Sequence, residues 1–165
     1  ERLARLTDAD PGRLINDLTA LGYAGGNFFA GRFSVRMGMN RMVLLGTIVT
    51  TAGLSMLLVL TLLGLSGPVM FFGLTIFLGL GNGICLPNAN AGMLSIKPEL
   101  AGTASGLGGA LLIGGGAALA ALAGVLLQPG STELPLILLM LASSVASVVA
   151  ILLVIRRARA LGLAA

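Results

Sequence analysis

The stretch LPLILLMLASSVASVVAILLVI, residues 134–155, decides the fold class because it is long, apolar and without charge. A helix needs about 20 residues to cross roughly 30 Å of hydrocarbon, and this stretch reaches that length. Its few polar side chains are the hydroxyls of Ser143, Ser144 and Ser147. We therefore expect this segment to contact lipid over much of its surface and to turn its serines toward a neighbouring helix.

Four further stretches of similar length precede this one. The chain is 56% hydrophobic and 10% charged, which excludes an ordinary soluble domain and a disordered chain. Backbone within lipid must satisfy its own hydrogen bonds, so only helices or a closed barrel can span a membrane, and these runs lack the alternation of barrel strands. The sequence predicts an all-α membrane protein with five spans, at residues 14–33, 42–65, 69–96, 102–127 and 134–155.

The positions of the basic residues predict how the spans are oriented. The first loop holds three arginines and no acid, and residues 156–165 hold three more. Loops rich in arginine and lysine favour the cytoplasmic side. We expect residues 1–13 to form an extracytoplasmic segment and residues 156–165 a cytoplasmic tail. The loop arginines are Arg32, Arg36 and Arg41.

Composition also narrows the chemistry. The chain has no histidine and one cysteine, Cys85, so we expect neither a metal site nor a cofactor. The basic residues stand at the ends of the spans without interleaved aromatics, which argues against a nucleic-acid partner. Because no carboxylates pair inside the hydrophobic region, an enzyme is the least favoured of the functions considered.

The first span is the most polar of the five and holds Asp17, Tyr23 and Asn27. An ionisable residue inside a membrane is often functional, so Asp17 faces either the outer interface or a water-filled cavity. The second span carries several threonines, whose hydroxyls we expect to bond their own helix backbone.

The third span combines small residues with a proline. Gly79 and Gly83 lie one turn apart, which allows another helix to approach closely, and Pro87 removes a backbone donor and predicts a bend. Asn82 lies between the two glycines. It either faces a cavity, as amides beside a bent transporter helix do, or links two helices.

The fourth span is rich in glycine and alanine. Small residues recur four apart, a period that lets helices pack by van der Waals contact and also lowers the rigidity of the helix. We expect these glycines to serve packing or to let the helix slide and bend. The glycines expected to do so are Gly102, Gly106, Gly116 and Gly124.

Two motifs carry a family resemblance. Residues 26–41, read as GNFFAGRFSVRMGMNR, resemble the loop between helices eight and nine of major facilitator superfamily transporters. The segment Pro87–Asn90 with Lys97–Leu107, which contains AGTAS, is similar to the junction between helices ten and eleven in the Bcr/CflA drug/proton antiporter family. Val35 is a departure, because an acid often stands there in that family.

The resemblance implies that the five spans correspond to helices 8–12 of a twelve-helix fold in a bacterial inner membrane. It implies that the third span lines the substrate cavity, flanked by the first and fourth, with the second and fifth outermost. The candidate cavity residues are Asn82, Asn27, Tyr23 and Asp17. Arg32, Arg36 and Arg41 would serve as a cytoplasmic gate, or as positive-inside anchors alone.

The leading hypothesis is therefore the C-terminal portion of a proton-coupled efflux permease for small apolar or amphipathic compounds, working by alternating access. Its partners would be a small-molecule substrate, protons, the lipid bilayer and the seven preceding helices of that fold. The alternatives are a non-transporting scaffold that packs against other helices, and an inactive transporter remnant.

Overall fold

The computed structural model describes residues 11–65, 68–95, 98–127 and 133–162. These residues are almost entirely helical and contain no strand, which confirms the predicted all-α class. The elements are α2 (Pro11–Met37), α3 (Met39–Leu62), α4 (Pro68–Ser95), the single 3-10 turn η1 (Pro98–Leu100), α5 (Ala101–Leu126) and α6 (Leu134–Ala160).

The helices match the five expected spans but end at different residues. α2 and α6 run several residues beyond their apolar cores, so part of the expected tail at 156–165 is helical. Apolarity predicts where a helix leaves lipid, whereas backbone hydrogen bonding decides where it ends. The expected loop after the first span shrinks to Gly38, whose φ of 83° lies in the left-handed region that glycine tolerates. Residues 1–10 of the expected outer segment lie outside the described residues.

Three of the described helices, α3, α5 and α6, are long and apolar enough to cross a membrane. α2 and α4, which hold most of the asparagines and close-packed glycines, are not among them. The chain thus carries the helices of an integral membrane protein.

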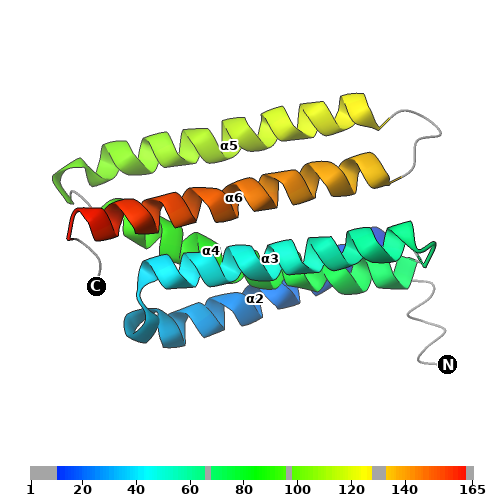
Figure 1. Ribbon diagram of the computed structural model, residues 1–165, viewed down its shortest axis with the longest axis horizontal. Coiled ribbons are helices and arrows are strands. Elements are labelled where there is room, and N and C mark those ends of the chain that lie inside the picture. Colours follow the sequence, from blue (N-terminus) through cyan, green and yellow to red (C-terminus); the bar gives the residue numbers. More distant parts are fainter. Residues whose placement is uncertain (1–10, 66–67, 96–97, 128–132, 163–165) are drawn as a thin grey trace.

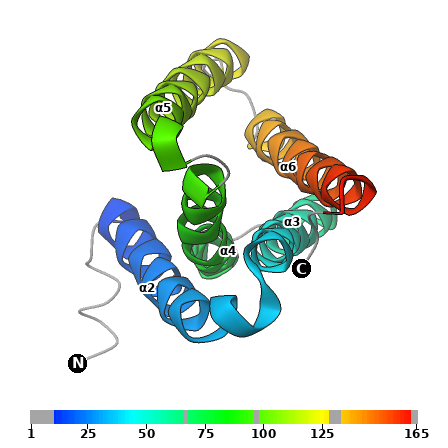
Figure 2. The same cartoon turned by 90° about the vertical axis from the view of Figure 1, so that its left-hand side faces the viewer.

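Successive helices run antiparallel along the long axis of the molecule (Figure 1). Seen end on, α4 sits between α2 and α3, α6 packs against α3, and α5 stands apart from the other four (Figure 2). This order differs from the arrangement that the resemblance implies, in which the first and fourth spans flank the third and the second span lies at the edge. Within this chain α3 is an inner helix, because it contacts both α4 and α6.

Two apolar clusters hold the inner helices together. Ala30, Met42 and Ile84 join α2, α3 and α4, and the rings of Phe29 and Phe33 pack beside them with centroids 4.6 Å apart. A second cluster joins α3, α4 and α6 and consists of Leu57, Leu74 and Ile137. In lipid such contacts stabilise by packing rather than by removing apolar surface from water.

Glycine brings α2 and α4 into backbone contact. A Cβ added at Gly79 would collide with the carbonyl oxygen of Thr19, and one at Gly83 with that of Tyr23. The contact is reciprocal, since Gly26 of α2 lies against Gly83. Gly79 and Gly83 thus lie in a close helix contact, as their spacing predicts.

The opposite face of α4 touches α3 in the same way. A Cβ on Gly46 would lie 2.6 Å from the carbonyl oxygen of Gly81, and one on Gly81 would lie 2.6 Å from that of Gly46. α4 is therefore wedged between two helices with glycine on both sides. α4 continues as one helix through Pro87.

Candidate functional site

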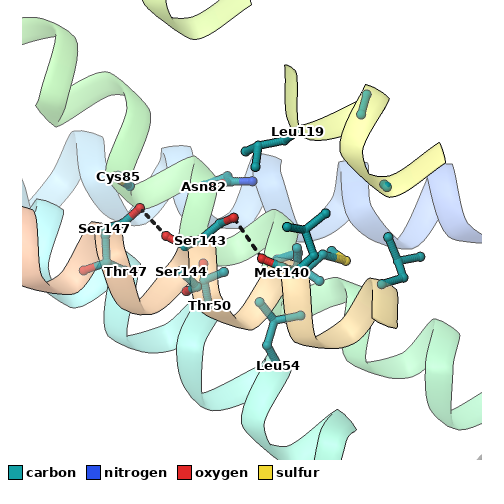
Figure 3. Close-up of a pocket in the computed structure, with 15 residues that line it drawn as sticks. Thr47, Thr50, Leu54, Asn82, Cys85, Leu119, Met140, Ser143, Ser144 and Ser147 are labelled. Carbon is teal, nitrogen blue, oxygen red and sulfur yellow. Dashed lines mark hydrogen bonds between the residues drawn. The ribbon is translucent and has the colours of Figure 1, made fainter. Parts of the chain in front are cut away.

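A cavity of about 420 Å³ lies among α3, α4, α5 and α6. Its size falls within the range of small-molecule sites, roughly 300–1,000 Å³. The close-up in Figure 3 shows hydroxyl side chains from α3 and α6 and the amide of Asn82 from α4 among apolar side chains. The apolar walls include Leu54, Leu78, Leu119, Leu136, Leu139 and Met140. We call this space the hydroxyl cavity.

The hydroxyls of α3 are held by their own helix. Thr47 donates to the Leu44 carbonyl at 2.9 Å and Thr50 donates to the Gly46 carbonyl at 3.2 Å. These bonds confirm that the threonines bond locally, and they have a chemical consequence. Because each hydroxyl hydrogen is already used, what these groups offer a ligand is the lone pairs of their oxygens.

The serines of α6 behave in the same way. Ser143 donates to the Leu139 carbonyl at 2.9 Å, and Ser147 donates to the Ser143 carbonyl at 3.0 Å (Figure 3). Ser144 instead pairs with Thr51 of α3, with 2.6 Å between their oxygens. Ser144 therefore lies on the face of α6 that meets a neighbour, as predicted for this span, whereas Ser143 and Ser147 line the cavity beside it.

Asn82 supplies what the hydroxyls lack. Its amide has two N–H donors and a carbonyl acceptor, and no other described residue bonds to it. Figure 3 shows the amide extending from α4 toward Leu119 of α5. Gly81 and Gly83 flank Asn82 and pack against α3 and α2, so α4 is fixed on both sides of it. The amide is thereby presented from a rigid support.

The cavity lining carries no ionisable group other than the thiol of Cys85. No group of histidine, cysteine, aspartate or glutamate able to hold a metal occurs within the described residues. The site can accept and donate hydrogen bonds and enclose apolar surface. It offers no acid–base pair.

The structure separates the four residues predicted to share a cavity. Asn82 lines the hydroxyl cavity, whereas Asn27 lines a different hollow between α2 and α4 and donates to the Tyr23 carbonyl at 3.0 Å. Tyr23 is 41% exposed, and Asp17 is exposed near the start of α2. These three residues share a helix with one another but not a cavity with Asn82.

The remaining predicted residues fall into two groups. Arg32, Arg36 and Arg41 are exposed at the joint of α2 and α3, where a gate or an anchor was expected. Among the glycines expected to pack, those of α5 have open space where a Cβ would stand. These are Gly102, Gly106, Gly116 and Gly124.

Sequence reasoning missed that the hydroxyls of the second and fifth spans line one cavity with Asn82. A signal was present, because Thr47, Thr50 and Thr51 cluster at the same depth as Ser143, Ser144 and Ser147 in two helices that run antiparallel. That correspondence becomes visible only once α3 and α6 are known to be neighbours.

Comparison with known proteins found no relative of this chain. Neither the protein-family models, nor the curated proteins, nor the solved structures contain a match to this chain.

Proposed function

We propose that this chain is the C-terminal portion of a secondary active transporter, and that the hydroxyl cavity takes part in the passage of small, uncharged, amphipathic compounds. The observation that supports this most directly is the free amide of Asn82 within a drug-sized cavity, walled by leucines and helices of membrane-spanning length. Such a combination of apolar wall and few polar groups is typical of ligand sites.

The lining indicates the chemical class of the compound. Hydroxyl oxygens on α3 and α6 accept hydrogen bonds, so a ligand with an O–H or N–H donor gains contacts there. The absence of charged side chains in the lining disfavours an ion, because a charge taken out of water needs a partner. A neutral molecule with an apolar body and one or two polar groups fits best.

In this proposal the chain corresponds to helices 8–12 of a major facilitator fold similar to the Bcr/CflA antiporters, with α2 and α4 also crossing the membrane. Both are longer than α3, and α4 packs against α2 on one side and against α3 on the other. The arginine-bearing ends of α2, α3 and α6 lie together, which supports a cytoplasmic position for that end (Figure 1). The membrane is then a bacterial inner membrane.

The seven preceding helices of that fold would supply the other wall of the passage and the proton-binding groups. α5 supports this because it buries none of its own residues in this chain and exposes Leu112 and Ile113. Alternating access would open the passage to each side in turn, in exchange for protons. The chain by itself is then expected not to drive efflux from vesicles, and robust efflux would show that no further helices are required.

Binding to the purified chain tests the assignment of the cavity. We expect an uncharged amphipathic dye to bind, and Asn82→Leu to weaken its Kd by about three- to tenfold, the equivalent of one hydrogen bond. Asn90→Leu is the matched control, since Asn90, like Asn82, is an exposed asparagine of α4 but does not line the cavity. Equal affinities for the two variants would remove Asn82 from the binding site.

A second candidate is a scaffold that packs against partner helices without transport. The bare surface of α5 favours it as much as it favours a larger transporter. The two differ in the cavity, because a scaffold has no need of ligand binding at Asn82. If a change in α5 abolishes assembly with a partner but leaves dye binding intact, both roles are supported together. If no dye binds in any assay, the scaffold is favoured.

A further inference from the structure

A second hollow, of about 650 Å³, lies between the first turn of α3 and the last turns of α6. Three arginines from these two helices line it: Arg41, Arg156 and Arg159. They are far apart in the sequence and meet because α3 and α6 are antiparallel neighbours. We call this hollow the arginine pocket.

Nothing within the described chain neutralises these charges. No ion pair joins the three arginines to a carboxylate among the residues that the structure describes. Of the described carboxylates, Asp17 and Glu133 lie toward the opposite end of the bundle, and Glu99, in η1 at the same end as the arginines, forms no ion pair with them. The negative end of the α6 dipole, near Arg159, offsets only part of one charge. The three guanidinium groups are exposed, so water and salt screen part of their repulsion, and an anion bound among them would offset the rest.

The end of α3 adds donors for such an anion. Gly38 precedes the helix and has no side chain to cap its first turn, so the first N–H groups of α3 lack a side-chain acceptor. Asn40, in the same turn, lines the pocket and provides an amide. A helix start beside arginine forks suits a phosphate, which accepts several hydrogen bonds at once.

The floor of the pocket indicates that the phosphate belongs to a lipid. Leu152 and Ile155 line the hollow together with Arg156 and Arg159. Leu152 is 43% exposed, so the hollow offers an open apolar surface next to the arginines. An acyl chain can lie along this surface while its headgroup meets the arginines. A free phosphate ion would leave the apolar floor uncovered.

From these contacts we propose that the arginine pocket binds the headgroup of an anionic phospholipid, with its acyl chains along α6. The site is separate from the hydroxyl cavity and depends only on the membrane location of α3 and α6. Bound lipid would link the ends of two helices that are otherwise joined by Thr51, Ser144 and apolar contacts.

The test is a titration of the detergent-solubilised full chain with phosphatidylglycerol, with bound lipids counted by native mass spectrometry. Phosphatidylcholine serves as the neutral lipid. We expect one phosphatidylglycerol to bind before any phosphatidylcholine does. Replacing Arg41, Arg156 and Arg159 together by Gln should weaken that binding about fivefold per arginine, or roughly a hundredfold in all.

The matched control removes the same charge from the same end of the molecule. Arg32, Arg36 and Arg157 do not line the pocket, and replacing these three by Gln should change the affinity by less than about threefold. Equal weakening by both triple variants would mean that the lipid responds to surface charge alone, and would overturn the proposal. So would equal binding of the two lipids.

Two further arms keep the outcome clear. Replacing the three pocket arginines by Lys keeps the positive charge and should leave the helices intact, but it removes the guanidinium groups that can bind a phosphate through two hydrogen bonds. We therefore expect about tenfold weaker lipid binding with an unchanged circular dichroism spectrum. Millimolar inorganic phosphate should fail to displace the lipid. Displacement by phosphate as efficient as by phosphatidylglycerol would identify a free-anion site and overturn the assignment to lipid.

Discussion

α4 and α5 both carry small residues four apart, yet their surroundings are opposite. At Gly79 and Gly83 of α4, a single added carbon would collide with the backbone of α2. At Gly116 and Gly124 of α5, the same carbon would meet nothing within 4 Å. Spacing alone therefore permits close packing, and a partner helix with small residues at matching positions decides whether it occurs.

α2 can pack closely against α4 because it carries glycines of its own opposite those of α4. Gly22 and Gly26 lie four apart on α2 and face Ile76, Leu80 and Gly83. Close backbones gain dispersion contacts that substitute for the hydrophobic drive absent in lipid. α5 has no such counterpart in this chain, and large side chains such as Ile113, 76% exposed, surround its glycines.

The largest expected effect comes from one substitution made in both helices. Gly83→Ala forces α2 and α4 apart and should destabilise the chain by about 1–3 kcal/mol. Gly116→Ala meets open space and improves helix propensity, so it should be neutral or stabilising by up to about 1 kcal/mol. Thermal unfolding in detergent, followed by circular dichroism, measures both. The same sign for both variants would break the comparison.

The α3 side of α4 provides the next effect. Gly81→Ala places a carbon against the Thr50 hydroxyl and 2.6 Å from the Gly46 carbonyl oxygen. We expect about 1–2 kcal/mol of destabilisation, because the nearest atom is a side-chain oxygen that can move and the nearest backbone atom is farther away than at Gly83. Thr50 lines the hydroxyl cavity, so dye affinity should fall as well. Lower stability without any change in affinity would separate the packing of α4 from the cavity.

The link between α3 and α6 should be weaker than either glycine contact. A double-mutant cycle with Thr51→Val and Ser144→Ala removes the hydroxyl pair, and the coupling energy should be about 0.6 kcal/mol, the average for such bonds in membranes. Ser147→Ala, which affects a bond within α6 only, is the control in a cycle with Thr51→Val. A coupling as large for Ser147 would show that the effect does not come from the pair.

The smallest effect is expected where α5 does meet a neighbour. A Cβ on Gly108 would lie 2.6 Å from the sulfur of Met93, the far end of a flexible side chain. Met93 can move at little cost, so Gly108→Ala should change the unfolding free energy by less than about 0.5 kcal/mol. A loss above 1 kcal/mol in the same unfolding assay would mean that α5 is packed more tightly than the comparison states.

Much of the fold could be predicted because length and apolarity determine which segments become helices in lipid. Five helices lie where the apolar stretches predict them, three of them apolar enough to cross a membrane, and the local bonds of Thr47 and Thr50 follow from the reach of a threonine hydroxyl. The ends were less accurate, as at Gly38, because hydropathy is silent on the residue at which a helix stops.

The site was harder to predict because it depends on which helices are neighbours. Asn82 stands out by itself as an amide in an apolar run, but its cavity partners come from α3 and α6 rather than from α2. The pairing of Arg41 with Arg156 and Arg159 was hidden for the same reason. Loop charges place these arginines on one side of the membrane, and only packing brings them to one pocket.

The most direct measurement of the hydroxyl cavity uses Cys85, the single cysteine of the chain, which lines it beside Asn82. The rate of Cys85 alkylation by a small apolar maleimide should fall severalfold as an uncharged amphipathic compound is titrated in. Half-maximal protection should need about three- to tenfold more compound in Asn82→Leu and an unchanged concentration in Asn90→Leu. An alkylation rate that is unaffected by every such compound, or a midpoint of protection that does not move in Asn82→Leu, would contradict a ligand site at this place.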